Sequence, residues 1–304
     1  MDILGEYKDI MESYLAIPVL VGVKTESEKF AGALYTTTLE AMMPDGKALQ
    51  MGTSHNLGQN FAKVFDITFI GEDEKAHQVW QTSWGISTRL IGALVMVHGD
   101  DRGLVMPPKV APVQVVIVPI TYKDTDSTAI LAKAKELMEK LKAKCIAAVL
   151  DDRTEYTPGW RLNEWELKGV PVRIEIGPRD LKQNQITLAR RDTYQKTTAK
   201  MGEAVQATEK LLEEIQNNLY AQAKTALEEK TVTVQNYDDF KETLKNKGGF
   251  IKAAWCGSAK CEEKIKEDTG ATIRLRPFEK EKPVTNCVCC GEKAVEMVYF
   301  ARSY

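Results

Sequence analysis

Five of the six cysteines lie within the last fifty residues, and no other feature limits the fold of that region as strongly. Cys256 and Cys261 have four residues between them, and Cys287 and Cys290 have two. Both spacings fall in the range of structural zinc sites, in which two short loops bring four thiolates together as a tetrahedron. Because four thiolates leave no open coordination position, the sequence predicts a structural rather than a catalytic Zn²⁺.

Two neighbouring features bear on this metal site. Cys289 stands beside Cys290 and is a spare in the scheme, because adjacent thiols rarely bind the same ion. Gly257 directly follows Cys256 and Gly291 directly follows Cys290, and both suit the tight turns that such loops need. The alternative is a set of free buried thiols without a metal.

Composition places the chain among ordinary globular proteins. Its 304 residues are enough for two or three domains, and 28% charged with 43% apolar residues is usual. The net charge of −2 gives no overall basic field, but a local basic face can still bind nucleic acid. The amino terminus lacks a secretion signal, and the longest apolar run, at 146–150, is too short to span a bilayer. We therefore expect a cytoplasmic protein with reduced thiols and no membrane partner.

The first 110 residues predict an antiparallel sheet with helices. Residues 1–20 carry apolar side chains at helical spacing, and Pro44-Asp45-Gly46 divides two alternating runs as a hairpin turn would. Further strands are expected over 63–70 and 78–84, followed by an amphipathic helix over 86–99. Antiparallel strands capped by a helix are typical of an α+β fold.

The pattern changes around Pro107-Pro108. Strands expected at 112–120 and 170–178, with a helix through Ile130 and Leu141, indicate an α/β domain with some parallel pairing. Residues 194–230 predict a long polar connecting helix. A last domain begins near Val232, with a helix over 238–247 and a β-like ending.

Arg89 is the most informative charge in the chain. It stands at the start of an apolar helix in the run SWGISTRLIGALVMVHGDDRGLVMPP. A cation at this position is expected to face a cleft and bind an anion, and the planar guanidinium suits a phosphate. The alternative is a helix-end arginine paired with a nearby carboxylate.

The same run resembles motif 3 of prolyl-tRNA synthetases, which leads into their anticodon-binding domain. KTESEKFAGALYTTT and LQMGTSHNLGQNFAKVFDI are similar to the catalytic domain of that family, and WELKGVPVRIEIGPRDL is similar to its anticodon-recognition stretch. The cysteine pairs and the terminal tyrosine resemble the archaeal/eukaryotic-like branch. The resemblance covers essentially the whole chain.

The resemblance implies three parts. They are a partial class II antiparallel catalytic sheet with motif 3 (1–110), an α/β anticodon-binding domain with its connecting helix (111–230) and a small α+β zinc-type domain (231–304). It also implies the reaction, in which proline and ATP with Mg²⁺ form prolyl-adenylate and proline is then transferred to tRNA(Pro). A homodimer is the expected assembly.

By resemblance, Arg89 is the catalytic residue that clamps ATP and neutralises phosphate charge. Adenylate formation needs positioned reactants and neutralised charge but no protein nucleophile. The other implied contacts are Gln50, Thr53 and Ser87 to ATP, with Phe30, Ser54, His55 and Tyr304 lining the substrate pocket. For His55 the alternative role is to orient its neighbours by hydrogen bonding. For Tyr304 the alternative is a frayed terminus.

Three residues are implied to read the anticodon, namely Glu166, Arg173 and Arg179. Proline anticodons share guanines at their second and third positions. A carboxylate accepts hydrogen bonds from guanine N1–H and N2–H, and arginine donates to O6 and N7. The alternative for each residue is a surface ion pair.

The family pattern is incomplete in this sequence. Motifs 1 and 2 are missing, and motif 2 supplies the arginine that grips the α-phosphate. We therefore expect a fragment with exposed strand edges and weak or no adenylate formation. The alternative is a non-catalytic tRNA-binding protein that keeps the anticodon and zinc domains.

Overall fold

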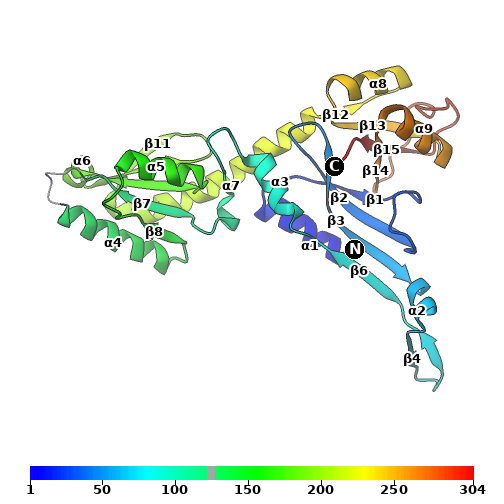
Figure 1. The fold of residues 1–304 in the computed structure, drawn as a ribbon, viewed down its shortest axis with the longest axis horizontal. Helices are drawn as coiled ribbons and strands as arrows, with labels where there is room; N and C mark the ends of the chain where they lie inside the picture. The colour runs from blue at the N-terminus through cyan, green and yellow to red at the C-terminus, as the bar shows by residue number, and fades with distance from the viewer. Residues whose placement is uncertain (122–126) are drawn as a thin grey trace. The chain divides into compact units, whose positions relative to one another are not determined.

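The computed structural model describes residues 1–121 and 127–304, which form two compact units (Figure 1). The first unit contains Met1–Ser13, Ile17–Ala93 and Lys224–Tyr304, and the second contains Tyr14–Ala16 and Leu94–Ala223. The carboxyl-terminal segment thus shares a unit with the amino-terminal segment. The division into three domains at 110 and 230 stays a prediction.

The first unit is built on an eight-stranded sheet in the order β12-β13-β15-β14-β1-β2-β3-β6. All neighbours are antiparallel except β12 and β13. The predicted hairpin is confirmed, because β2 and β3 pair across a turn in which Met43 N–H donates to the Lys47 carbonyl at 2.9 Å. The strands are β1 (Leu20–Val23), β2 (Tyr35–Met42), β3 (Ala48–Gly58), β6 (Gln81–Gly85), β12 (Thr231–Thr233), β13 (Phe250–Trp255), β14 (Thr272–Pro277) and β15 (Glu296–Ala301).

The helices of this unit begin with α1 (Asp2–Asp9), which continues as a π-helical turn over Ile10–Tyr14. The single strand predicted over 63–70 is wrong, because α2 (Asn60–Phe65) occupies its first half. Asp66 ends α2 in a left-handed conformation with φ of 53°, and a small hairpin of β4 (Thr68–Ile70) and β5 (Ala76–Gln78) follows. The remaining helices are α8 (Tyr237–Asn246), α9 (Ala259–Thr269) and the first half of α3 (Arg89–His98). The helix predicted over 86–99 is thus confirmed from residue 89 on.

The second unit has a five-stranded sheet in the order β11-β10-β9-β7-β8. The expected parallel pairing is confirmed between β7 and both β8 and β9. The predicted helix over 194–230 is wrong at its start, because residues 196–200 pair with β10 as an antiparallel strand. Its elements are β7 (Val115–Pro119), α4 (Thr128–Ala143), β8 (Ala148–Leu150), α5 (Pro158–Leu167), β9 (Val172–Ile176), α6 (Pro178–Lys182), β10 (Gln185–Arg190), β11 (Lys196–Lys200) and α7 (Ala204–Glu229).

Both faces of the β7 strand are buried, which explains its unbroken apolar run. Val115 and Ile117 point to the face covered by α4 and the first turns of α7, and Val116 and Val118 point to the face covered by α5. Successive side chains of a strand alternate between faces. This sheet is therefore a self-contained scaffold for the loops at its edges.

One glycine permits the long-range pairing in the first unit. Gly22 of β1 lies opposite Pro277 of β14, and a Cβ atom at Gly22 would lie only 2.3 Å from the Arg276 carbonyl oxygen. The obstacle is backbone, which cannot turn away as a flexible side chain can. Two segments from opposite ends of the chain thus join at a position where a side chain does not fit.

We predict that Gly22→Ala destabilises the chain by about 1–3 kcal/mol, the usual cost of inserting atoms into a packed site. Gly5→Ala is the control, because a Cβ atom there meets nothing within 4 Å. Ala in that helix should stabilise by about 0.5–1 kcal/mol. Urea unfolding of both variants tests this, and equal stability would contradict the close approach.

Candidate functional site

A polar network crosses from β2 to β3 beside an aromatic side chain. His55 Nδ1 lies 2.9 Å from the Thr36 hydroxyl, and His55 Nε2 lies 3.1 Å from the Thr53 hydroxyl. The Phe30 N–H donates to the same Thr36 hydroxyl at 3.0 Å, and the Phe30 ring lies 4.9 Å from the imidazole. The hairpin register, which pairs Thr36 with His55, brings these residues together.

The imidazole is a neutral hydrogen-bonding group. Burial lowers the pKa of His55 below its ordinary value, which favours the neutral form of the ring. A neutral ring that bonds two hydroxyls fixes their orientation. This geometry matches the orienting role and also leaves His55 beside any ligand that contacts Thr53.

Arg89 is exposed at the first residue of α3. Its Nη1 donates to the Gln50 backbone carbonyl at 3.1 Å, and its backbone N–H donates to the Ser87 hydroxyl at 3.4 Å. Across the described ranges 1–121 and 127–304, no carboxylate forms an ion pair with this arginine. The guanidinium is therefore held next to β3 by a neutral acceptor and keeps its charge for another partner.

Two residues predicted to line the substrate pocket, Ser54 and Tyr304, are not part of the His55 hydrogen-bond network. Ser54 follows Thr53 on β3, and alternation along a strand turns its side chain to the opposite face from Thr53 and His55. Tyr304 is anchored rather than frayed, since its hydroxyl donates to Asp45 at 2.7 Å and Lys47 lies 4.8 Å from its ring. The chain end thus contacts the β2–β3 turn and not the His55 network.

A buried charge cluster on β2 was not predicted from the sequence. Glu40 is fully buried and accepts from Lys24 Nζ at 2.8 Å, from Arg274 Nε at 3.1 Å and from the Thr38 hydroxyl at 3.0 Å. Lys24 also donates to the Arg274 carbonyl at 2.8 Å. The signal that would have revealed it is a glutamate inside the apolar strand pattern LYTTTLEAMM, because a buried carboxylate needs paired partners.

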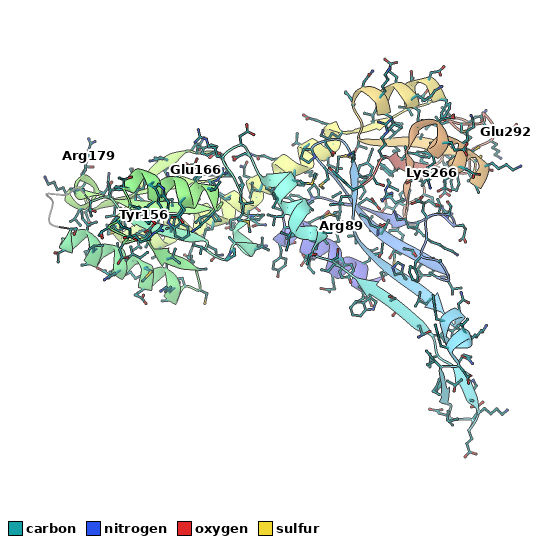
Figure 2. The ribbon with its side chains drawn as sticks, viewed as in Figure 1. Arg89, Tyr156, Glu166, Arg179, Lys266 and Glu292 are labelled. Carbon is teal, nitrogen blue, oxygen red and sulfur yellow. The ribbon has the colours of Figure 1, made fainter. Side chains whose placement is uncertain are left out.

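The predicted anticodon residues divide into two places in the second unit. Glu166 near the end of α5 and Arg173 at the start of β9 approach to 3.8 Å, between Oε2 and Nη1. Arg179 lies beyond the other end of β9, in α6, and is exposed (Figure 2). The structure therefore brings Glu166 and Arg173 together and leaves Arg179 apart from them.

A cavity of about 160 Å³ borders the Glu166–Arg173 pair. Three residues that the sequence did not single out line it, namely Arg102, Arg191 and Tyr194. Arg102 Nη1 donates to Glu166 Oε1 at 3.2 Å, and Arg191 Nε donates to the Glu166 carbonyl at 2.9 Å. Arg102 belongs to the run GDDRG, whose basic and acidic side chains were the available sequence signal.

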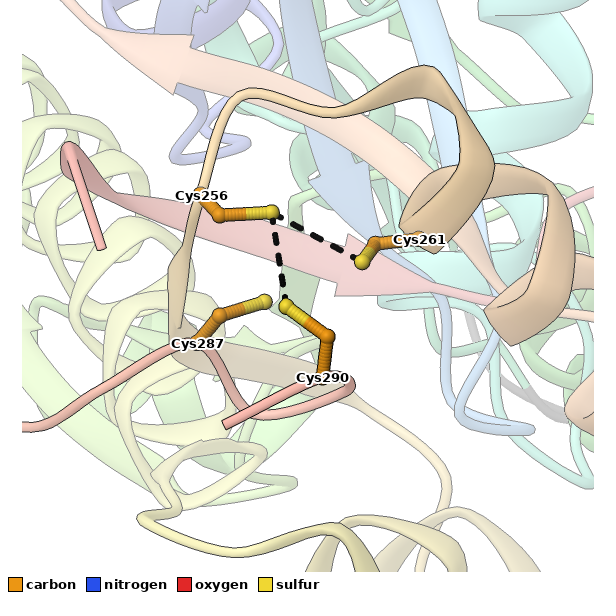
Figure 3. A group of neighbouring side chains, drawn as sticks. All are labelled: Cys256, Cys261, Cys287 and Cys290. Carbon is orange, nitrogen blue, oxygen red and sulfur yellow. Dashed lines mark hydrogen bonds between the residues drawn. The ribbon is translucent and has the colours of Figure 1, made fainter. Parts of the chain in front are cut away.

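Figure 3 shows the four cysteines around one point. All four Sγ atoms lie within 4.8 Å of one another, with Cys256 Sγ 3.6 Å from Cys261 Sγ and 3.8 Å from Cys290 Sγ. A tetrahedron with Zn–S bonds of about 2.3 Å has sulfur–sulfur edges of about 3.8 Å. The separations therefore fit a tetrahedral thiolate site, and Cys289 is not in this group.

The backbone at this cluster also suits thiolate ligands. Burial raises the pKa of the Cys287 thiol, but backbone N–H groups of Cys290, Cys289 and Cys256 bond its sulfur and bring the pKa below its usual value. The two predicted turn glycines have φ of 84° at Gly257 and 73° at Gly291, as such tight turns require. All six cysteines are free thiols.

None of the helices in the described part of the chain combines the length and apolar character needed to cross a membrane.

Comparisons with known families match three successive regions. Residues 2–98 match the family described as "tRNA synthetase class II core domain (G, H, P, S and T)", and residues 114–211 match "Anticodon binding domain". Residues 237–304 match "Prolyl-tRNA synthetase, C-terminal". These three regions follow the order that the sequence motifs predict.

Curated relatives match along the entire chain. The proline–tRNA ligase of Natranaerobius thermophilus is 54% identical over 306 residues, covering 100% of this chain and 63% of that protein. The proline–tRNA ligase of Alkaliphilus oremlandii is 52% identical, covering 100% and 62%. Proline–tRNA ligase 2 from a strain of Bacillus cereus is 51% identical, covering 100% and 63%.

The chain thus spans a little under two thirds of the length of these relatives. Its class II core, anticodon-binding and carboxyl-terminal regions are those of one family. The chain belongs to the prolyl-tRNA synthetase family.

Proposed function

We propose that this chain serves in the ATP-dependent attachment of proline to tRNA(Pro) through prolyl-adenylate. The parts of the enzyme that this chain supplies are motif 3, the anticodon-binding domain and the carboxyl-terminal domain. The observation that carries this proposal is Arg89, a cation with no carboxylate partner in the described residues, held at 3.1 Å by the Gln50 carbonyl beside β3. Such a fixed cation can neutralise charge that develops on a transferring phosphate.

In this proposal ATP, accompanied by Mg²⁺, binds against β3. Arg89 contacts phosphate or purine, with Gln50, Thr53 and Ser87 as neighbouring contacts. His55 holds the Thr53 hydroxyl in place, and Phe30 supplies an apolar wall. Ser54 and Tyr304 are the weaker members of the proposed pocket, because Ser54 points to the other face and Tyr304 bonds Asp45.

In the same proposal, Glu166 and Arg173 read guanines of the anticodon, and Arg179 contributes from a separate place. The ion pair between Glu166 and Arg173 agrees equally with a surface role, so binding to RNA is the test. A homodimer and a cytoplasmic location complete the proposal. Both rest on family membership.

The catalytic part of the proposal includes an expectation of weak activity for this chain alone. β6 has only β3 as a partner in the described residues, and Trp84 on it and Ile86 after it are exposed. An open edge with exposed apolar side chains invites pairing with another polypeptide. The alternative is a tRNA-binding protein without catalysis, favoured by the self-contained core and cavity of the second unit.

We predict that the purified chain supports proline-dependent ATP–pyrophosphate exchange about 10²–10³-fold more slowly than a full-length relative. This is the usual effect of losing one strong electrostatic donor, here the arginine of motif 2. Both proteins are assayed together. Exchange at the rate of the relative would contradict the expectation. Absence of exchange with retained binding of tRNA(Pro) would favour the non-catalytic alternative.

Arg89→Ala should weaken binding of ATP with Mg²⁺ by about ten- to a hundredfold, because a hydrogen bond to a charged group contributes about 1.5–3 kcal/mol. Arg302→Ala is the matched control, since Arg302 is also exposed and also donates to a backbone carbonyl, that of Thr269 at 2.9 Å. Calorimetric titration measures both. Equal weakening by the two variants would contradict the role given to Arg89.

The four cysteines would hold one structural Zn²⁺ per chain. Cys256→Ser should lose the metal and lower the melting temperature, because the energy of metal binding contributes to folding. Cys289→Ser should keep the metal and change the melting temperature little. Metal analysis and thermal unfolding decide between them, and loss of zinc from both variants alike would contradict the assignment of ligands.

A further inference from the structure

Arg102 and Arg173 bind the same carboxylate but are held very differently. Arg173 lies 3.8 Å from Glu166 Oε2, donates to Glu175 at 3.0 Å and has a side chain only 14% exposed. Arg102 donates to Glu166 Oε1 at 3.2 Å and has a side chain 63% exposed. Arg173 is therefore fixed in the wall of the cavity, whereas Arg102 can leave at little cost.

The Arg102 guanidinium also lies over an aromatic ring. Its Cζ atom is 4.5 Å from the centre of the Tyr194 ring. A flat group of N–H donors thus stacks on a ring and donates to a carboxylate at the same time. The Watson–Crick edge of guanine carries the same chemistry, because its N1–H and N2–H donors flank one carbon and its ring system stacks on tyrosine.

Tyr194 is held in place by an unusual local structure. Its φ of 61° lies in the left-handed region, which is costly for a bulky residue. Its hydroxyl bonds Asp100 and accepts from Arg191 Nη1 at 2.8 Å, and Arg191 in turn donates to both Asp100 oxygens at 2.7 and 2.8 Å. The ring is therefore fixed before any ligand arrives.

The cavity beside Arg102 and Tyr194 is larger than a single water molecule requires. The cavity bordered by Arg102, Glu166 and Tyr194 holds about 160 Å³, whereas a single water requires about 10–15 Å³ by the same measure. Departure of the exposed Arg102 side chain would enlarge it further. A planar base is a fitting occupant of that volume.

We propose that Arg102 is a placeholder for a guanine base of the anticodon loop. The incoming guanine displaces Arg102, stacks on Tyr194 and donates its N1–H and N2–H groups to Glu166. This inference rests on the proposed tRNA-binding function and names Tyr194 as the stacking residue of its pocket. Asp100 and Arg191 are positioning residues, since they act through Tyr194.

The test measures binding of the whole chain to a fluorescent RNA stem-loop with a proline anticodon, by anisotropy. Each of the two guanines is replaced in turn by inosine, which lacks the N2 amino group. For the wild-type chain, one replacement should weaken binding about tenfold, as for the loss of one specific base contact. Glu166→Gln should abolish this discrimination.

The variants at the platform separate stacking from simple charge. Tyr194→Leu should weaken binding of the guanine loop about tenfold, the usual effect of losing a stacked aromatic ring. Tyr194→Phe keeps the ring and should stay within about threefold of the wild type. Arg102→Ala should bind the guanine loop at least as tightly and keep the guanine-to-inosine ratio.

Several results would overturn the inference. If Arg102→Ala loses the guanine-to-inosine ratio, Arg102 is itself a contact and not a placeholder. If Tyr194→Leu and Tyr194→Phe both bind like the wild type while Glu166→Gln loses discrimination, the stacking role is wrong but the anticodon pocket stands. If the wild-type chain does not distinguish the proline anticodon from an unrelated one, the proposed function fails with it.

Discussion

A single fully buried carboxylate joins the two ends of the chain in the first unit. Glu40 forms ion pairs with Lys24, the residue after β1, and with Arg274 of β14, so removal of its carboxylate would leave two buried cations facing each other. Breaking a buried pair in this way typically costs about 3–5 kcal/mol, more than most single contacts. The carboxyl-terminal strands are thus an integral part of the sheet that carries the candidate catalytic residues.

The same carboxylate accepts a hydrogen bond from a hydroxyl beside the candidate site. Glu40 accepts from Thr38, which lies opposite Thr53 in the hairpin register, and Thr53 bonds His55. Burial lowers the pKa of Lys24, and the attraction of Glu40 works against that change. A polar row of this kind fixes side-chain rotamers along one face of β2 and β3, which is the kind of preorganisation that adenylate chemistry requires.

The second unit holds polar side chains around a cavity of about 160 Å³. Both faces of β7 are buried, so the polar residues that line the cavity come from element ends and loops. Glu166 lies near the end of α5, Arg173 lies at the start of β9, and Tyr194 lies in the loop before β11. The three residues line the same cavity because the pairing of the strands brings these element ends together.

Several local features of this chain follow from neighbouring residues alone. The Pro44-Asp45-Gly46 turn, the apolar helix behind Arg89 and the cysteine spacings are encoded in neighbouring residues, so pattern and spacing predict them. Long-range packing set the pairing of β1 with β14, the burial of Glu40, the separation of Arg179 from Glu166 and the contact of Arg102 with Tyr194. These depend on contacts between residues far apart in the chain, for which local periodicity carries no signal.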